Sequence, residues 1–210
     1  MKKLKIGKLD SDILKKLVLD RIEFKRPEVR IGAGVGEDCA VIDFGNYDCV
    51  VSTDPITASV RDIGRLSIHI SCNDIASDGI QPLGITLAVM LPEGSTQEDL
   101  TMIMDQAAQA AKAAQVQIVG GHTEVTPAVK QPVIVSTAFG RALPGQSANA
   151  KSMRENDLIL LTKNAGLEGT GIIASDREDE LKNILSQHEI DRAKRMLEDV
   201  SVVKEGIIAG

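Results

Sequence analysis

The chain has 210 residues, 43% of them hydrophobic, which is enough for one large domain or two small ones. Only 2% of the residues are aromatic and the formal net charge is −6, so base stacking and phosphate-backbone binding are both disfavoured. A nucleotide held through magnesium stays open, because the cation supplies the positive charge.

Cysteine usage and hydropathy predict a cytoplasmic protein with no nucleic-acid or membrane partner. Cys39, Cys49 and Cys72 are widely spaced among apolar residues, which is typical of buried thiols in a reducing compartment. The basic start of the chain lacks the apolar stretch of a signal peptide. No apolar run reaches the ~18 residues that a membrane span needs.

The first half of the chain alternates helices and strands. Apolar spacing predicts a helix over residues 10–24. The glycine run 32–38 then leads into a strand, which forms a hairpin with a second strand, 48–53, that ends at Asp54. A helix over residues 61–77 follows, with Ser77, Asp78 and Gly79 as its exit turn.

Further strands are predicted over residues 83–91, 116–119 and 132–139, with an alanine-rich helix from Thr96 to Gln115. The short strand 116–119 is expected to end in a loop, Gly120-Gly-His-Thr-Glu124. Some neighbouring strands must be antiparallel, so the fold class is a mixed α/β (α+β) arrangement rather than a purely doubly wound sheet.

A polar stretch after residue 143 is the best domain boundary. It separates a first domain, residues 1–143, from a second segment, residues 144–210. The second segment is predicted to contain the linker, a strand over 158–162, a loop over 166–171 and then helices. Because it is short of strands, we expect it to be the start of an incomplete C-terminal α/β domain.

Four acidic residues are candidates for holding a cation. Asp74 and Asp78 lie four apart on a helix, a like-charge pairing that costs about 0.2–0.5 kcal/mol. Both are near the helix C-terminus, where an anion costs about 0.3–1 kcal/mol more. A divalent cation would offset these costs. The alternatives are that Asp78 only forms the exit turn, that Asp54 only forms a turn before Pro55, and that Asp38 is solvated.

Two glycine-rich stretches accompany these acids. Gly34 and Gly36 could bring backbone amides close to phosphate, although the stretch is neither a P-loop nor a dinucleotide fingerprint. In the second stretch, His122 is a surface loop residue, a phosphate donor or a metal ligand. Acid and glycine clusters at several element ends together suit binding of Mg-ATP.

Four motifs in order resemble the aminoimidazole ribonucleotide (AIR) synthase superfamily: Gly34-Val-Gly-Glu-Asp-Cys-Ala-Val41, Ser52-Thr-Asp54, Asn73-Asp-Ile-Ala-Ser77 and Gly120-Gly-His-Thr123. The resemblance covers about residues 5–140. It implies an N-terminal ATP-binding domain whose strands form a barrel-like homodimer with a second subunit.

The resemblance also implies the ligands of the site. Magnesium would be held by three aspartates, and ATP by the glycine stretches and an asparagine: Asp38, Asp54 and Asp74 for the metal, and Gly34, Gly36, Asn73, Gly120, Gly121, His122 and Thr123 for the cofactor. The family often has an acid where this chain has His122, so one metal position is open, and Glu124 is a substitute.

The opening of the chain resembles the HypE-like (hydrogenase expression/formation) branch. That branch uses ATP to dehydrate a thiocarboxamide on a C-terminal cysteine, and the resemblance implies hydrogenase maturation partner proteins. No such cysteine occurs in these 210 residues. We therefore keep three alternatives: a HypE-type dehydratase, an AIR synthase-related enzyme with another small substrate, and a non-catalytic nucleotide-binding dimer. The catalytic residues stay unassigned.

Overall fold

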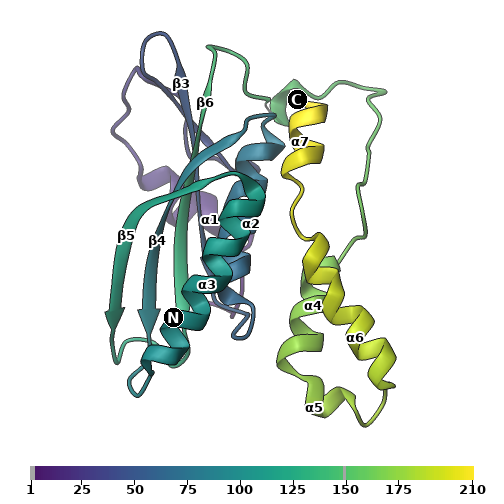
Figure 1. Ribbon diagram of the computed structural model, residues 1–210. Helices are drawn as coiled ribbons and strands as arrows, with labels where there is room; N and C mark the ends of the chain where they lie inside the picture. Colours follow the sequence, from purple (N-terminus) through teal and green to yellow (C-terminus); the bar gives the residue numbers. More distant parts are fainter. Residues whose placement is uncertain (1–2, 149) are drawn as a thin grey trace.

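The computed structural model describes residues 3–148 and 150–210. In this part of the chain one six-stranded sheet has the order β1-β2-β3-β6-β4-β5 (Figure 1). Only β4 and β5 run parallel, which confirms the mixed α/β class. The strands are β1 (Val29–Ile31), β2 (Ala40–Asp43), β3 (Asp48–Ile56), β4 (Pro82–Leu91), β5 (Gln117–Val125) and β6 (Val133–Ala142).

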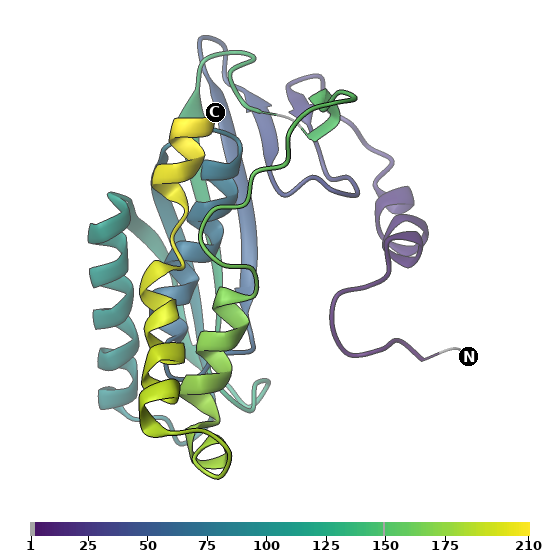
Figure 2. The same ribbon diagram turned by 90° about the vertical axis from the view of Figure 1, so that its right-hand side faces the viewer.

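Two long helices, α2 (Ile63–Ser77) and α3 (Gln97–Ala114), pack beside each other on one face of the sheet (Figures 1 and 2). The apolar positions of α2 and the inward residues of β4 meet in the core, where Ile63, Leu66 and Ile85 are fully buried. The predicted start of α3 is confirmed, because Thr96 and Asp99 form a capping box. Residues on the opposite face of the sheet, among them Val51 and Val135, are only half-buried.

The N-terminal segment stands apart from the sheet (Figure 2). The predicted helix over 10–24 is shorter in the structure, where α1 (Ser11–Leu17) is followed by a single 3-10 turn, η1 (Leu19–Arg21). Neither element buries a residue, so no packing energy extends the helix further.

Residues 150–210 form short helices beside α2: η2 (Ala150–Ser152), α4 (Leu167–Asp176), α5 (Glu178–Leu181), α6 (Gln187–Arg195), η3 (Met196–Asp199) and α7 (Val203–Ala209). The predicted strand 158–162 was wrong, because no strand of the described residues pairs with it. Its four apolar side chains, Leu158 to Leu161, are 72–97% exposed. The predicted loop 166–171 was also wrong, since α4 begins inside it.

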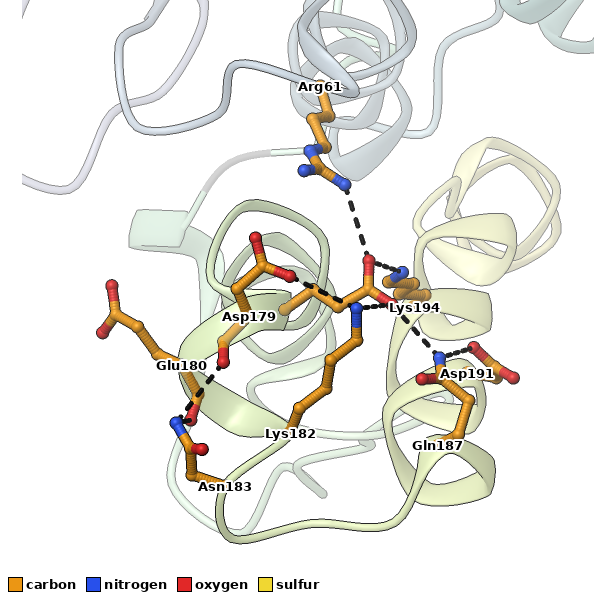
Figure 3. A network of polar contacts seen from close by, with 9 residues as sticks. Arg61, Asp179, Glu180, Lys182, Asn183, Gln187, Asp191 and Lys194 are labelled. Atoms are coloured by element: carbon orange, nitrogen blue, oxygen red, sulfur yellow. Dashed lines mark hydrogen bonds and ion pairs between the residues drawn. The ribbon is translucent and has the colours of Figure 1, made fainter.

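Polar contacts attach this second segment to the loop before α2. The carboxylate of Asp176 accepts hydrogen bonds from the amides of Val60 and Arg61, at 3.0 and 3.2 Å. The Arg61 side chain lies 3.6 Å from Glu178, which also pairs with Lys194 at 2.7 Å (Figure 3). Within the described residues, none of the helices has the length and apolar character to cross a membrane.

Candidate functional site

Two of the predicted aspartates meet where α2 lies on β3. The strand does not end before Asp54, as predicted, but continues to Ile56 because it stays paired with β6. Asp74 comes from the facing side of α2, close enough for Asp54 to raise the pKa of its carboxyl. Ser52 lies two residues before Asp54 on β3 and therefore on the same face of the sheet. Its hydroxyl donates to Oδ2 of Asp74 at 2.7 Å.

The surroundings of Asp74 disfavour its negative charge. Burial, first, and then the neighbouring Asp54 raise the pKa of the Asp74 carboxyl to about 7, against the lowering effect of the Ser52 hydroxyl. The charge of Asp38 acts in the same direction. Among the described residues neither carboxyl forms an ion pair with a lysine or arginine, so a divalent cation would stabilise the two together.

Two other predicted acids, Asp38 and Asp78, line a cavity of about 260 Å³. Gly36, Asp38 and Asp78 line it, together with Glu37, Cys39, Ser77 and Ala148. Asp78 caps the end of α2, as predicted, and it also accepts a hydrogen bond of 2.6 Å from the Ser147 hydroxyl. Gly34 is not among the lining residues. The acids therefore gather at one end of α2, beneath the linker that contains Ser147.

A paired carboxylate and a buried thiol also belong to the lining of this cavity. Glu37, whose side chain is only 9% exposed, pairs with Lys151 of the linker at 2.6 Å. Burial, foremost, and the surrounding aspartates raise the pKa of the Cys39 thiol. The thiol is therefore protonated and a poor nucleophile, which agrees with the prediction of a buried structural cysteine.

These residues fit a magnesium ion that also binds phosphate. Among residues 3–148 and 150–210, no group of three or more His, Cys, Asp or Glu side chains is placed to hold a metal by itself. Magnesium, however, is usually held by one or two carboxylates plus waters and substrate phosphates. Asp54 and Asp74 provide such a pair, and Asp38 adds negative charge nearby.

Asn73, a predicted ATP ligand, is used differently in the structure. Its Nδ2 donates to the carbonyl of Val200 at 2.9 Å, and its Oδ1 accepts from the amide of Val202 at 2.8 Å. Both ends of the amide thus hold the second segment against α2. Sequence reasoning missed this role because the partners lie more than 120 residues away along the chain.

The Gly120–Thr123 motif lies elsewhere. The prediction of a loop was wrong: these residues are inside β5, the exposed edge strand, because the chain stays paired with β4. In the ladder, Gly121 aligns with Leu87, Leu87 with Ser136, and Ser136 with Asp54. Three strand spacings of about 4.8 Å put roughly 14 Å between the two motifs. A single chain therefore does not bring the Gly120–Thr123 motif next to Asp54.

Local chemistry explains the shape of this edge. A Cβ on Gly121, whose φ is +146°, would lie 1.9 Å from the Leu87 carbonyl oxygen. Only glycine fits this approach. The His122 side chain is 67% exposed and lies 3.5 Å from Glu124, so it is available to a second molecule.

Two residues near Asp54 were missed from the sequence. Ser52 could have been found, because a serine at an inward position of an apolar strand needs a hydrogen-bond partner. Glu168 on α4 could not, since only the tertiary fold brings it near. Burial raises the pKa of the Glu168 carboxyl, the charge of Asp54 raises it further, and Lys8 opposes the shift.

Known proteins resemble this chain in sequence and in fold. A hydrogenase expression/formation protein of Methanocaldococcus jannaschii is 30% identical over 174 residues, which cover 80% of this chain and 52% of that protein. The carbamoyl dehydratase HypE of Cupriavidus necator is 36% identical over 115 residues, 54% of this chain and 33% of its own. The solved structure of the hydrogenase maturation protein HypE in complex with ATP superposes with a TM-score of 0.56 at 26% identity, covering 83% of this chain and 52% of that one.

This chain spans about half the length of the M. jannaschii relative. The family model of the AIR synthase related protein N-terminal domain matches residues 36–142, just over half of the 210 residues. That range contains the strands β2 to β6, both long helices, three of the four motifs and the first motif from Gly36 onward. The chain therefore belongs to the AIR synthase related family, with HypE-type hydrogenase maturation proteins among its relatives.

Proposed function

We propose that this chain is the ATP-binding part of a Mg-ATP-dependent enzyme. The observation that carries the proposal is the meeting of Asp54 and Asp74, two half-buried residues that form no ion pair within residues 3–148 and 150–210. A HypE structure in complex with ATP is 26% identical to this chain over the aligned residues. This similarity supports ATP as the cofactor.

In this proposal Asp54 and Asp74 orient a magnesium ion, with Asp38 adding negative charge. The ion, when bound, neutralises phosphate oxygens as a phosphoryl group is transferred. The amides around Gly34 and Gly36 approach the phosphates, where glycine leaves the backbone accessible. The residues of this chain thus supply positioning and charge compensation, which are the main contributions to phosphoryl transfer.

The substrate class we propose is an amide-like group, by analogy with the carbamoyl dehydratase relatives. The amide oxygen attacks the γ-phosphorus, ADP leaves, and the amide nitrogen gives up the first of its two protons. The resulting imidate phosphate then loses inorganic phosphate and a proton from nitrogen, which gives a nitrile, so the oxygen of the lost water ends in phosphate. Hydrogenase maturation proteins are the corresponding proposed partners.

One observation bears on the second candidate, a nucleotide-binding dimer without catalysis. Asn73 binds the second segment through Val200 and Val202, and its amide keeps one Nδ2 hydrogen and one Oδ1 acceptor position for a nucleotide. Another small substrate of an AIR synthase-related enzyme is the other alternative.

A homodimer is part of the proposal. The sheet face opposite α2 and α3 presents half-buried apolar residues such as Val51, Ala88 and Val135. A second copy would cover that face and could bring the exposed His122 of one subunit to the aspartates of the other. We further propose that residues 144–210 begin a second domain, in which the exposed Leu158 to Leu161 become a buried strand.

Thermal denaturation with and without Mg-ATP tests cofactor binding, and release of inorganic phosphate tests turnover. The proposed enzyme gives a raised melting temperature, and phosphate release once an amide substrate and the full-length protein are supplied. Binding without any turnover would favour the nucleotide-binding dimer. An unchanged melting temperature at saturating Mg-ATP would contradict both.

A further inference from the structure

The hydroxyl of Ser52 is placed unusually for a residue of this sheet. Ser52 is 4% exposed, at an inward position of β3 between the buried Val50 and the half-buried Asp54. A buried hydroxyl without a partner costs free energy, and such groups commonly bond to the nearest backbone carbonyl. Ser67 on α2 does so, donating to the Gly64 carbonyl at 2.8 Å. Ser52 instead donates to the carboxylate of Asp74 at 2.7 Å.

A second pair of hydroxyls fixes the same helix at the same level of the sheet. The Ser71 and Ser136 hydroxyl oxygens are 2.8 Å apart, and the Ser136 hydroxyl also lies 3.4 Å from the Asp54 carbonyl oxygen. α2 is therefore held on the sheet close to Asp54. With the helix held in place, the torsions of the Asp74 side chain are what remains to be fixed.

The bond from Ser52 fixes those torsions without using up the carboxylate. A hydroxyl donates one hydrogen, so it occupies one of the roughly four acceptor positions of Asp74 and leaves the others available. A lysine or arginine in the same place would instead neutralise the charge that a cation needs. This is the chemistry expected of a group that orients a ligand rather than one that replaces the cation.

We propose that Ser52 is a positioning residue for the Asp54–Asp74 pair, setting its affinity for a divalent cation through Asp74. The proposal rests on the proposed function, because it assumes that these carboxylates hold magnesium. Hydrogen-bonded neighbours of metal ligands typically change metal affinity by 10- to 100-fold when they are removed. A purely structural Ser52 would change stability and leave metal affinity as it is.

The experiment measures Mn²⁺ binding to the purified 210-residue chain in the presence of ATP, from the electron paramagnetic resonance signal of free Mn²⁺. Ser52→Ala is expected to weaken Mn²⁺ binding at least 10-fold. Ser52→Thr, which keeps a hydroxyl and suits a strand, restores most of it. Ser67→Ala removes an equally buried hydroxyl from α2 and leaves Mn²⁺ affinity unchanged.

Unchanged Mn²⁺ affinity in Ser52→Ala would overturn the positioning role, whatever its melting temperature. If Ser52→Ala does not fold, Ser52→Val takes its place, since valine has the shape of threonine, suits a strand and has no donor. Wild-type affinity in Ser52→Val is then the overturning result. Absence of Mn²⁺ binding by the wild-type chain would instead overturn the proposed function, and the positioning role with it.

Discussion

Two regions at the same level of one sheet differ sharply in their surroundings. Around α2, Asp54 and Asp74 are half-buried between the sheet and the helix, and no ion pair of the described residues neutralises them. Three strands away, Gly121 and His122 lie on an edge strand that pairs with β4, and both residues are exposed. Both regions carry motifs of one family, so the comparison teaches that one chain brings Asp54 and Asp74 together but leaves Gly120–Thr123 facing outward.

The largest expected effect tests the enclosure of α2. His69 is buried on this helix with its Nδ1 unpartnered, and burial, first, then Arg65 and Lys163 lower its pKa from 6.5 to about 4. A lowered histidine pKa means that the folded chain prefers the neutral form. The stability that the neutral His69 contributes is complete above pH 6.5. As the pH falls from 6.5 towards 4, the free energy of unfolding decreases by about 3 kcal/mol, because the unfolded chain binds a proton that the folded chain does not.

Urea denaturation at pH 7 and pH 4 checks this prediction, with His69→Gln as the comparison. The variant should lack this part of the acid destabilisation. Equal losses in both proteins would show that His69 is solvated and that the region around α2 is as open as the β5 edge.

Neutralising the enclosed acid pair gives the next largest effect. At a Mg-ATP concentration 100 times Kd, ligand binding stabilises the wild-type chain by about 2.7 kcal/mol. Asp74→Asn is expected to lose this stabilisation while the unliganded protein stays folded, because an amide relieves the repulsion from Asp54. Differential scanning fluorimetry measures both quantities. The exposed Asp105→Asn is the charge control and should respond to Mg-ATP as the wild type does.

The open edge is tested by Gly121→Ala. Its positive φ and the overlap with the Leu87 carbonyl predict a loss of about 2 kcal/mol in the free energy of unfolding. Gly120→Ala meets no heavy atom within 4 Å and should cost less. Urea denaturation measures the stability of both variants. Gly120→Ala reports the strain of a positive φ alone, and Gly121→Ala reports that strain together with the overlap. Equal stabilities would mean that β5 moves freely away from β4.

The smallest effect on stability belongs to His122→Ala, below about 0.5 kcal/mol, because the side chain is exposed. If the edge of one subunit completes the site of another, this variant still loses Mg-ATP affinity. Mixing it with Asp74→Asn chains should then restore some binding, since a mixed dimer contains one intact site. Calorimetric titration of the mixture measures this. Binding by His122→Ala alone at wild-type affinity would show that the open edge has no part in the site.

Much of the first domain was predictable because its signals are local. The alanine-rich composition and the Thr96–Asp99 capping box identify α3 within one residue of its true start. The strand around Leu83–Leu91 is a continuous apolar run. The strand over 158–162 failed for the opposite reason: its sequence favours a strand, but a strand needs a neighbour, and the described residues offer none.

The candidate site divides in the same way. Motif order and residue chemistry were enough to select Asp54, Asp74 and the glycine stretches, because carboxylates and backbone amides are the groups that Mg-ATP requires. Which of them meet depends on strand order and helix docking. The fold brings Glu168 near Asp54 and Ser147 to Asp78, although no sequence signal pointed to either. Asn73 instead bonds to Val200, and His122 lies on the edge strand away from the aspartates.

The sequence by itself determined the family and the mixed α/β class, because these follow from residue types and patterns at short spacing. Only the tertiary structure decided that β6 and β4 separate the two motifs and that Ser52 holds Asp74. The physical reason is that such contacts join residues far apart in the chain. They form only when the core of α2, α3 and the sheet has packed, and no local propensity encodes them.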